Sequence, residues 1–226
     1  DRIAGRAMGT FAEEAAQEYQ FTREEMDNYA IESLRRANEA ITHGKFDKEI
    51  TPVTVVTRKG EVTVDVDEQP GKGNPDKIPQ LRAAFAKDGR ITAATSSSIS
   101  DGAAALVLTR QSIAEKLGKK PIARVVAHAA AAQEPARFTS APVPALHKVL
   151  EKAGWNVDDV DLWEVNEAFA CVAMIAMRDL GIPHEKINVN GGATALGHPI
   201  GASGARITTT LIAALQDRGL KRGVAS

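Results

Sequence analysis

The sequence has 226 residues, of which 43% are hydrophobic, so it can bury an ordinary core in one large domain or two small ones. Its 28 Lys and Arg residues offset 29 Asp and Glu residues to a net charge of −1, without a run of like charge, which argues against a nucleic-acid-binding surface. No apolar stretch reaches the roughly 18 residues of a membrane span, and no signal-peptide core follows Asp1, so we expect no membrane attachment.

The first third of the chain predicts a helix, a hairpin and a loop. Residues 22–25, Thr-Arg-Glu-Glu, form a capping box, and apolar positions at helical spacing extend the predicted helix over residues 22–42. Two runs rich in β-branched residues, 53–56 and 62–66, flank a Lys-Gly pair and predict a β-hairpin. The segment 70–79 begins and ends with proline and predicts a loop.

From residue 102 onward, short apolar runs alternate with helical patterns. We predict strands at residues 102–108, 122–127, 162–165 and 187–190, and helices at residues 111–117, 142–153, 168–180 and 203–218. Such alternation is typical of an α/β fold with helices on both faces of a largely buried sheet. Because the chain lacks an initiator Met and residues 222–226 resemble the opening of a further strand, we expect part of a longer polypeptide.

A glycine-rich segment, residues 188–206, lies between a predicted strand and a predicted helix and holds five glycines and His198. Glycines let such a loop fold tightly around a ligand, and an imidazole can exchange a proton near neutral pH. The spacing excludes a P-loop, a nucleophile elbow and a dinucleotide-binding fingerprint, because each lacks a required residue. Taken alone, the segment fits a structural turn with a structural histidine equally well.

Asn166 and Glu167 follow a predicted strand and precede a predicted helix. Ligands bind at the carboxyl ends of strands in open α/β sheets, which favours a functional position. Asn166 lies 32 residues before His198, about one α/β unit, so both side chains can face one crevice. A solitary Asn here is more simply explained as a helix N-cap, and that alternative stays open.

Together these motifs resemble the thiolase family. The resemblance is strongest in two segments, in this order: Asn-Glu-Ala-Phe-Ala at residues 166–170 and Gly-His-Pro-Ile-Gly-Ala-Ser-Gly at residues 197–204. The segment 92–104 and the Met-Gly element within residues 7–13 also resemble the family, so the resemblance covers essentially the whole chain. It implies an α/β fold comprising the C-terminal half of the thiolase αβαβα core and an α+β loop domain.

The resemblance also implies a domain organisation. Residues 1–101 would form the loop domain that binds substrate and coenzyme A, and residues 102–120 the terminal piece of the N-terminal thiolase domain. Residues 121–226 would form the C-terminal thiolase domain, truncated before its last strand. A dimer or tetramer of identical chains, acting in lipid metabolism, is the assembly that the family leads us to expect.

Thiolases join or cleave acyl thioesters through an acyl group held on one cysteine, while a second cysteine moves a proton. By resemblance, His198 would activate the nucleophile and donate to a thioester oxyanion, Asn166 would hold a water beside it, and Glu167 would orient its neighbours. Neither family cysteine is present: they are expected before Asp1 and after Ser226. We therefore predict that this chain alone does not turn over substrate.

The predicted substrate is a short coenzyme A thioester, acetyl-CoA or acetoacetyl-CoA, with no permanently bound cofactor and no metal. Residues that the resemblance assigns to the acyl pocket are Met8, Phe85, Ala168 and Phe169, and those assigned to the pantetheine arm are Ala93 and Ser97. Ordinary core packing explains the apolar members equally well. Two alternatives remain: a longer-chain 3-ketoacyl-CoA thiolase, and a non-catalytic fragment that binds coenzyme A.

The single cysteine, Cys171, lies within the apolar run of a predicted helix. Buried cysteines behave as small hydrophobic residues with raised thiol pKa, so we interpret Cys171 as a core residue and not as a nucleophile. One cysteine also excludes an intrachain disulfide, which fits the reducing cytoplasm.

Overall fold

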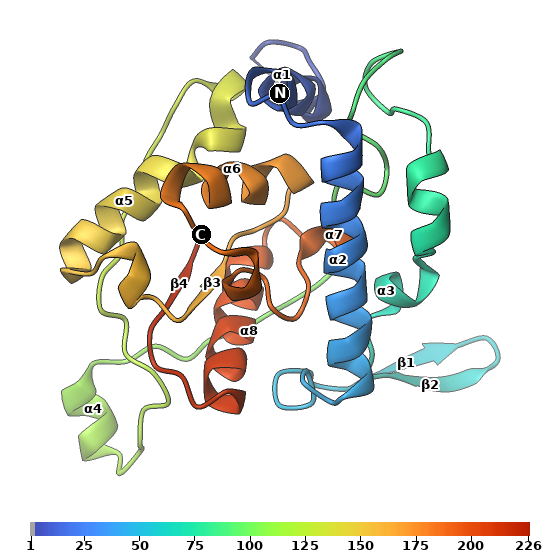
Figure 1. Cartoon of the computed structure of the whole chain (residues 1–226). Coiled ribbons are helices and arrows are strands. Elements are labelled where there is room, and N and C mark those ends of the chain that lie inside the picture. The colour runs from blue at the N-terminus through green and yellow to red at the C-terminus, as the bar shows by residue number, and fades with distance from the viewer. Residues whose placement is uncertain (1–2) are drawn as a thin grey trace.

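The computed structural model describes residues 3–226, and two short parallel strands, β3 and β4, lie at its centre (Figure 1). The four strands are β1 (Val53–Thr57), β2 (Gly60–Val64), β3 (Leu162–Glu164) and β4 (Gly223–Ala225). In the β3–β4 ladder Leu162 pairs with Gly223 and Glu164 with Ala225. The strand expected at the end of the sequence is thus confirmed.

The helices account for most of the regular structure. They are α1 (Met8–Glu18), α2 (Arg23–Thr42), α3 (Glu68–Lys72), α4 (Gln111–Lys116), α5 (Pro142–Ala153), α6 (Ala170–Leu180), α7 (Ala193–Leu196) and α8 (Ser203–Asp217), with 3₁₀ turns η1 (Pro75–Gln80), η2 (Pro135–Ser140), η3 (Val157–Asp159) and η4 (His184–Lys186). All five predicted helices are confirmed, although α6 begins two residues later than expected. No helix in residues 3–226 combines the length and apolar character needed to cross a bilayer.

The capping box at the start of α2 forms as predicted. Thr22 Oγ1 accepts from the backbone N–H of Glu25 at 3.1 Å, and the Glu25 carboxylate accepts from the Thr22 N–H at 2.6 Å. These bonds satisfy two N–H groups near the helix start and hold the pKa of Glu25 below its usual range. The 20-residue helix lies alongside η1, α3, α6 and α7 (Figure 1).

The two faces of β3 bury different sets of side chains, because successive residues of a strand point in opposite directions. Trp163 and Val165 belong to the main core cluster, which contains most of α6. Leu162 packs instead with Leu211 and Ala214 of α8. The expectation of a strand covered by helices on both faces therefore holds for β3.

The hairpin β1–β2 extends away from the rest of the molecule (Figure 1), and every residue in both strands is exposed. Its register pairs Val53 with Val64 and Val55 with Val62, and the predicted hairpin is confirmed. The segment 70–79, however, is not simply a loop: α3 ends at Lys72 and η1 follows. Asn74 caps η1 by accepting from the Asp76 N–H at 3.1 Å. The two prolines had favoured the prediction of a loop.

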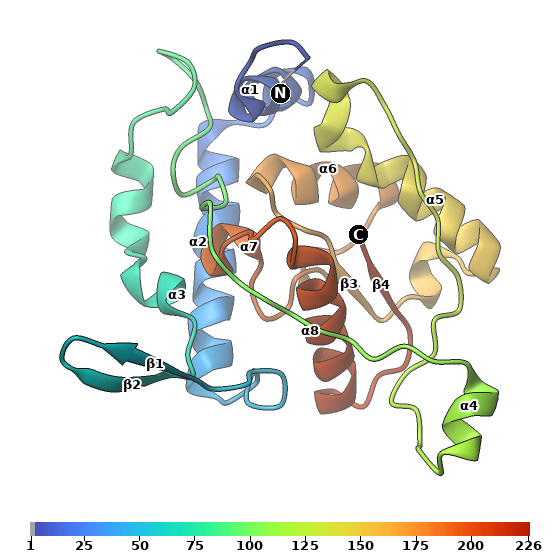
Figure 2. The ribbon, with the colours of Figure 1, turned by 180° about the vertical axis from the view of Figure 1, so that it is seen from behind.

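The strands expected at residues 102–108 and 122–127 are wrong. Both segments are irregular and unpaired, and Val107 and Ile122 are 98% and 74% exposed. Figure 2 shows this part of the chain running along the outside of α8 to α4 and back toward α5. A strand needs a neighbour for its backbone N–H and C=O groups, and no strand within residues 3–226 pairs with either segment.

The strand expected at residues 187–190 is reduced to a single parallel bridge between Ile187 and Trp163. Asn188 has a φ of +46°, which turns the backbone out of the extended conformation. Its side chain continues the pairing instead: the amide accepts from Val165 N–H at 2.9 Å and donates to Val165 C=O at 2.8 Å. The Asn188 side chain thus makes the hydrogen bonds to Val165 that the backbone of a neighbouring strand would otherwise make.

Candidate active site

The structure brings Asn166 and His198 together. Asn166 follows β3, and His198 follows the short helix α7, 32 residues later. The Asn166 Nδ2 atom lies 3.4 Å from His198 Nε2, and both side chains are half-buried. The two residues that the sequence singled out as catalytic candidates therefore lie within hydrogen-bond distance of each other.

Backbone hydrogen bonds fix both residues. The Asn166 N–H donates to the Ser226 carbonyl at 2.8 Å, which extends the β3–β4 ladder by one step. The His198 N–H donates to the Ser98 carbonyl at 3.2 Å. Gly197, which precedes the histidine, has a φ of +94°, a conformation that residues other than glycine rarely adopt. Three segments distant in sequence thus converge on the imidazole.

The environment keeps the imidazole of His198 neutral. Burial lowers the histidine pKa below its usual value of 6.5, and the positive charge of Arg206 lowers it further. His198 Nδ1 lies 2.6 Å from Ser203 Oγ, so Nε2 is the ring nitrogen on the side of Asn166. The Asn166 Oδ1 atom is buried and has no hydrogen-bond partner among the described residues. The pair therefore offers a neutral imidazole and an unsatisfied amide oxygen.

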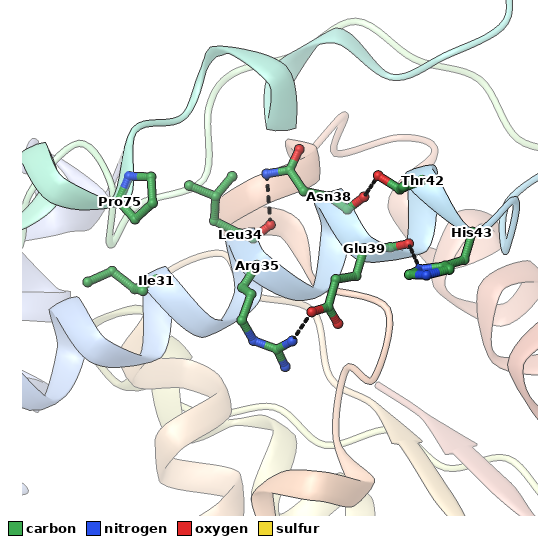
Figure 3. Close-up of a pocket in the computed structure, with 8 residues that line it drawn as sticks. All are labelled: Ile31, Leu34, Arg35, Asn38, Glu39, Thr42, His43 and Pro75. Atoms are coloured by element: carbon green, nitrogen blue, oxygen red, sulfur yellow. Dashed lines mark hydrogen bonds and ion pairs between the residues drawn. The ribbon is translucent and has the colours of Figure 1, made fainter.

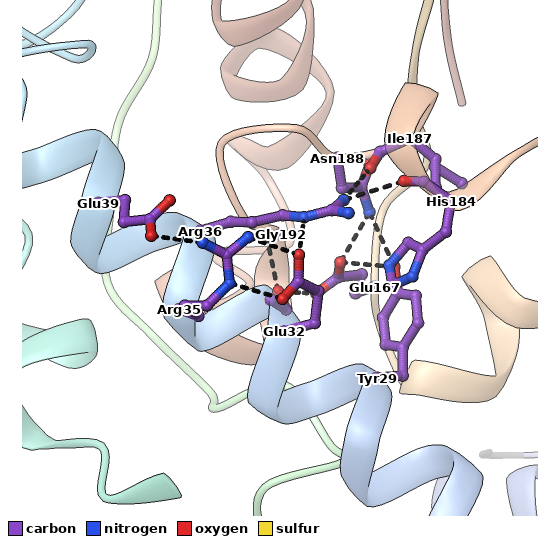
Figure 4. A network of polar contacts seen from close by, with 11 residues as sticks. Tyr29, Glu32, Arg35, Arg36, Glu39, Glu167, His184, Ile187, Asn188 and Gly192 are labelled. Atoms are coloured by element: carbon purple, nitrogen blue, oxygen red, sulfur yellow. Dashed lines mark hydrogen bonds and ion pairs between the residues drawn. The ribbon is translucent and has the colours of Figure 1, made fainter.

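Glu167, next to Asn166, is fully buried and connects the candidate site to α2 (Figure 4). Its two carboxylate oxygens accept hydrogen bonds from Tyr29 Oη at 2.8 Å, Ser33 Oγ at 2.9 Å, Asn188 Nδ2 at 2.7 Å, Thr194 Oγ1 at 2.6 Å and Thr194 N at 3.1 Å. Gly192 packs so closely against the carboxylate that a Cβ there would overlap it. The strand end, the glycine-rich segment and α2 are thereby held by one carboxylate.

Sequence reasoning missed the donors on α2. Tyr29 and Ser33 occupy positions on the buried face of the helix, where the pattern indicated only core packing. Their spacing of four residues places both hydroxyls on one side, and this was the available signal. Burial raises the pKa of Tyr29 well above 10, and the Glu167 carboxylate raises it further, so the phenol remains a donor.

A second layer of charge supports this network. Arg36 of α2 donates to the carbonyls of His184 at 3.1 Å and Ile187 at 2.7 Å, and pairs with Glu32 at 2.6 Å (Figure 4). The His184 ring stacks on Tyr29 with centroids 5.2 Å apart. Arg36 therefore anchors the segment that leads into the glycine-rich loop.

Two of the predicted acyl-pocket residues, Phe85 and Phe169, lie in one aromatic group. Phe169 meets Phe85 edge-on with ring centroids 6.0 Å apart, and Phe138 in the same manner at the same distance. Met8, which is 38% exposed, begins α1 immediately before Gly9, whose backbone packs against the Phe85 ring. Phe138, on η2, was not predicted, because nothing in its local sequence indicates an aromatic contact.

The remaining predicted positions lie where the segment 92–100 meets α6. Ser97 donates to the Ala168 carbonyl twice, from its N–H at 3.1 Å and from its hydroxyl at 2.9 Å. Ala93 is exposed. The main-chain contacts of Ala168 thus hold the segment 92–100 beside the loop that carries Asn166.

Cys171 is a core residue. Its side chain is fully buried in α6, and burial raises the pKa of its thiol to about 12.

Two surface hollows of about 460 and 580 Å³ border α2, and neither includes Asn166 or His198. Figure 3 shows the smaller one, formed by the outer face of α2 and Pro75.

Comparison with known families agrees with this geometry. The model of the thiolase N-terminal domain matches residues 1–112, and the model of the thiolase C-terminal domain matches residues 119–226. The chain belongs to the thiolase family. The family models cover both motifs that first indicated the relationship.

Relatives of this thiolase chain have been named as acetyl-CoA acetyltransferases. A probable acetyl-CoA acetyltransferase of Dictyostelium discoideum is 48% identical over 227 residues, which are 100% of this chain and 55% of the relative. The acetyl-CoA acetyltransferase of Allochromatium vinosum is 48% identical over 97% of this chain and 56% of its own length. The chain therefore spans about half the length of the curated relatives that it matches.

Two solved structures show the same fold. The Bacillus anthracis acetyl-CoA acetyltransferase superposes with a TM-score of 0.95 and 43% identity, over 98% of this chain and 56% of that protein. Human mitochondrial 3-ketoacyl-CoA thiolase superposes with a TM-score of 0.90 and 36% identity, over 100% of this chain and 57% of that protein. The predicted thiolase-like α/β fold is confirmed.

Proposed function

We propose that this chain carries the histidine and asparagine of the acyl-transfer site of an acetyl-CoA acetyltransferase, which condenses two acetyl-CoA molecules or cleaves acetoacetyl-CoA with coenzyme A. The observation that carries the proposal is the 3.4 Å approach of Asn166 Nδ2 to His198 Nε2 at the end of β3. The names of the relatives with 48% identity support the choice of substrate.

His198 would act first as a general base. Its lowered pKa leaves the imidazole unprotonated near neutral pH, so Nε2 can accept the proton of a thiol and generate the thiolate that attacks the thioester. The resulting imidazolium can then donate to the oxyanion that forms as the tetrahedral centre develops. Asn166 would help from the other side, because its unsatisfied Oδ1 can accept a hydrogen bond from a water that donates to the same oxyanion.

The thiol would not come from Cys171, whose pKa of about 12 and full burial make it a poor nucleophile. It is the only cysteine of the chain. We therefore infer that the catalytic cysteines belong to the part of the thiolase that these 226 residues do not include, and that the chain by itself does not turn over substrate.

The aromatic group of Phe85, Phe138 and Phe169 would bound the acyl pocket, with Met8 beside it. Rings that contact one another edge-on form a rigid wall, which favours a short acyl chain. Ser97 and Ala93 lie on the segment that would receive the pantetheine arm. A coenzyme A thioester is thus the substrate, and no permanently bound cofactor or metal enters the scheme.

A longer-chain 3-ketoacyl-CoA thiolase is the second candidate, favoured by the TM-score of 0.90 with human mitochondrial 3-ketoacyl-CoA thiolase. The two candidates differ only in the acyl pocket. Comparing kcat/KM for thiolysis of acetoacetyl-CoA and of 3-ketododecanoyl-CoA separates them, because each added methylene is worth roughly 1 kcal/mol only in a pocket that accommodates it.

A chimaera tests the catalytic roles. These 226 residues replace the matching segment of the Allochromatium vinosum relative, which supplies the remainder of a complete thiolase. We expect the chimaera to cleave acetoacetyl-CoA with coenzyme A, and His198→Ala to lower kcat by about 10²- to 10⁴-fold. His147→Ala, on the exposed side of α5, is the matched control and should leave kcat unchanged.

Thiolysis at the full rate by the His198→Ala chimaera would remove His198 from the mechanism. A folded chimaera that binds coenzyme A but never cleaves acetoacetyl-CoA would instead favour a non-catalytic binding fragment. Circular dichroism of each variant establishes that lost activity is not lost folding.

A further inference from the structure

Ser203, the first residue of α8, contacts the imidazole on the side away from Asn166. Its hydroxyl oxygen lies 2.6 Å from His198 Nδ1 and 3.1 Å from the Pro199 carbonyl oxygen. The backbone N–H of Ser203 also donates to the Pro199 carbonyl at 2.9 Å, and the residue is 5% exposed. The hydroxyl therefore has two partners in a place that bulk water hardly reaches.

The roles within these contacts follow from donor counting. A serine hydroxyl has one hydrogen to donate, and a carbonyl oxygen can only accept. When its hydrogen is directed at the Pro199 carbonyl, Ser203 Oγ has only lone pairs left for His198, and Nδ1 then carries the shared hydrogen. A neutral imidazole protonated at Nδ1 has an unprotonated Nε2.

The contact on the opposite side of the ring requires the same assignment. Asn166 Nδ2 is a donor and lies 3.4 Å from His198 Nε2. An Nε2–H would place two donors against each other, whereas an unprotonated Nε2 accepts from the amide. The Nδ1–H tautomer satisfies both contacts, whereas the Nε2–H tautomer sets two donors against each other at Asn166.

We propose that Ser203 is a positioning residue that holds His198 in the Nδ1–H tautomer and leaves Nε2 free as the base. The tautomer assignment stands on the three contacts alone, whereas its consequence for catalysis rests on the proposed function. Without the Ser203 hydroxyl, Nδ1 loses its acceptor and the Nε2–H form, which cannot take a proton at Nε2, becomes populated.

The tautomer can be observed directly in the 226-residue chain labelled with ¹⁵N-histidine. Long-range ¹H–¹⁵N correlation spectra at pH about 8 distinguish the protonated ring nitrogen from the unprotonated one. We expect His198 to show a protonated Nδ1 in at least about tenfold excess, and His198→Gln to identify its signals by their loss. A protonated Nε2 in the unmodified chain overturns the proposal, whatever the variants do.

Variants then test the hydroxyl. Ser203→Ala should shift the population toward Nε2–H by about tenfold or more, and Ser203→Thr, which keeps a hydroxyl, should restore the Nδ1–H form. Thr208→Ala is the matched control, since it removes a 2.8 Å bond to the Gly204 carbonyl from the same helix without touching His198. An unchanged tautomer in folded Ser203→Ala overturns the proposal.

The same variants in the chimaera connect the tautomer to turnover. Ser203→Ala should lower kcat for thiolysis by about 10- to 100-fold with little change in KM, and Ser203→Thr should recover most of the loss. A tautomer that switches while kcat stays constant would contradict the role of His198 as base and leave the positioning role of Ser203 intact. The two failures are therefore distinguishable.

Discussion

Ile187 and Ile122 both lie in apolar runs that predict strands, yet Ile187 is fully buried and Ile122 is 74% exposed. Ile187 forms a bridge to Trp163 of β3 and lies in the main core cluster. Ile122 lies in the unpaired segment on the outside of the molecule (Figure 2). An apolar residue stabilises the fold when it is buried, but whether it is buried depends on the backbone and side chains that lie next to it.

The sharpest test of this comparison substitutes the same residue type in both places. Ile187→Ala should lower the free energy of unfolding by about 2–5 kcal/mol, because it leaves a cavity in a close-packed core. Ile122→Ala should change it by less than about 0.5 kcal/mol. Urea denaturation followed by circular dichroism measures both, and equal losses would show that the exposed segment is buried in solution.

The polar connections of the buried region provide the next test. Glu167→Gln keeps the shape but turns one acceptor oxygen into a donor that faces hydroxyl and amide donors. We expect the free energy of unfolding to fall by roughly 2–4 kcal/mol, since at least one buried donor then lacks a partner. Glu185→Gln, an exposed site on η4, is the control. A loss below about 0.5 kcal/mol would mean that the network does not hold α2 to the site.

A smaller effect, which depends on pH, is expected at Glu164. Burial raises the pKa of this β3 carboxyl to about 8, even though Arg206 Nη1 lies 3.7 Å from its Oε2 atom and opposes the shift. Between its unfolded value of 4.5 and about 8, the folded protein binds more protons than the unfolded chain. The free energy of unfolding therefore falls as pH rises through this window.

Glu164→Gln removes this dependence. At pH 5 the two proteins should be similarly stable, and at pH 9 the variant should be more stable by roughly 1–3 kcal/mol, because the amide is never ionised. Glu151→Gln, on the exposed side of α5, should leave the pH profile unaltered. Parallel profiles of Glu164→Gln and the unmodified protein would contradict the assignment.

Local patterns predicted the helices well. The capping box of α2, the proline at the start of α5 and the apolar spacing of α8 are interactions within one segment, so the sequence alone determined them. The hairpin β1–β2 was equally predictable, because its strands pair across a short turn. Asn166 and His198 were also found from sequence, through two motifs that are contiguous in the chain.

Contacts between distant segments were decided only by the tertiary structure. The donors to Glu167 come from residues up to 138 positions away, and Phe138 joins the aromatic group from a turn with no distinctive pattern. Whether an apolar run becomes a strand depended on the presence of a partner, which Ile187 found and Ile122 did not. The physical reason is that a local pattern fixes what each residue can do, whereas burial and hydrogen-bond pairing depend on which groups the folded chain brings within a few ångströms.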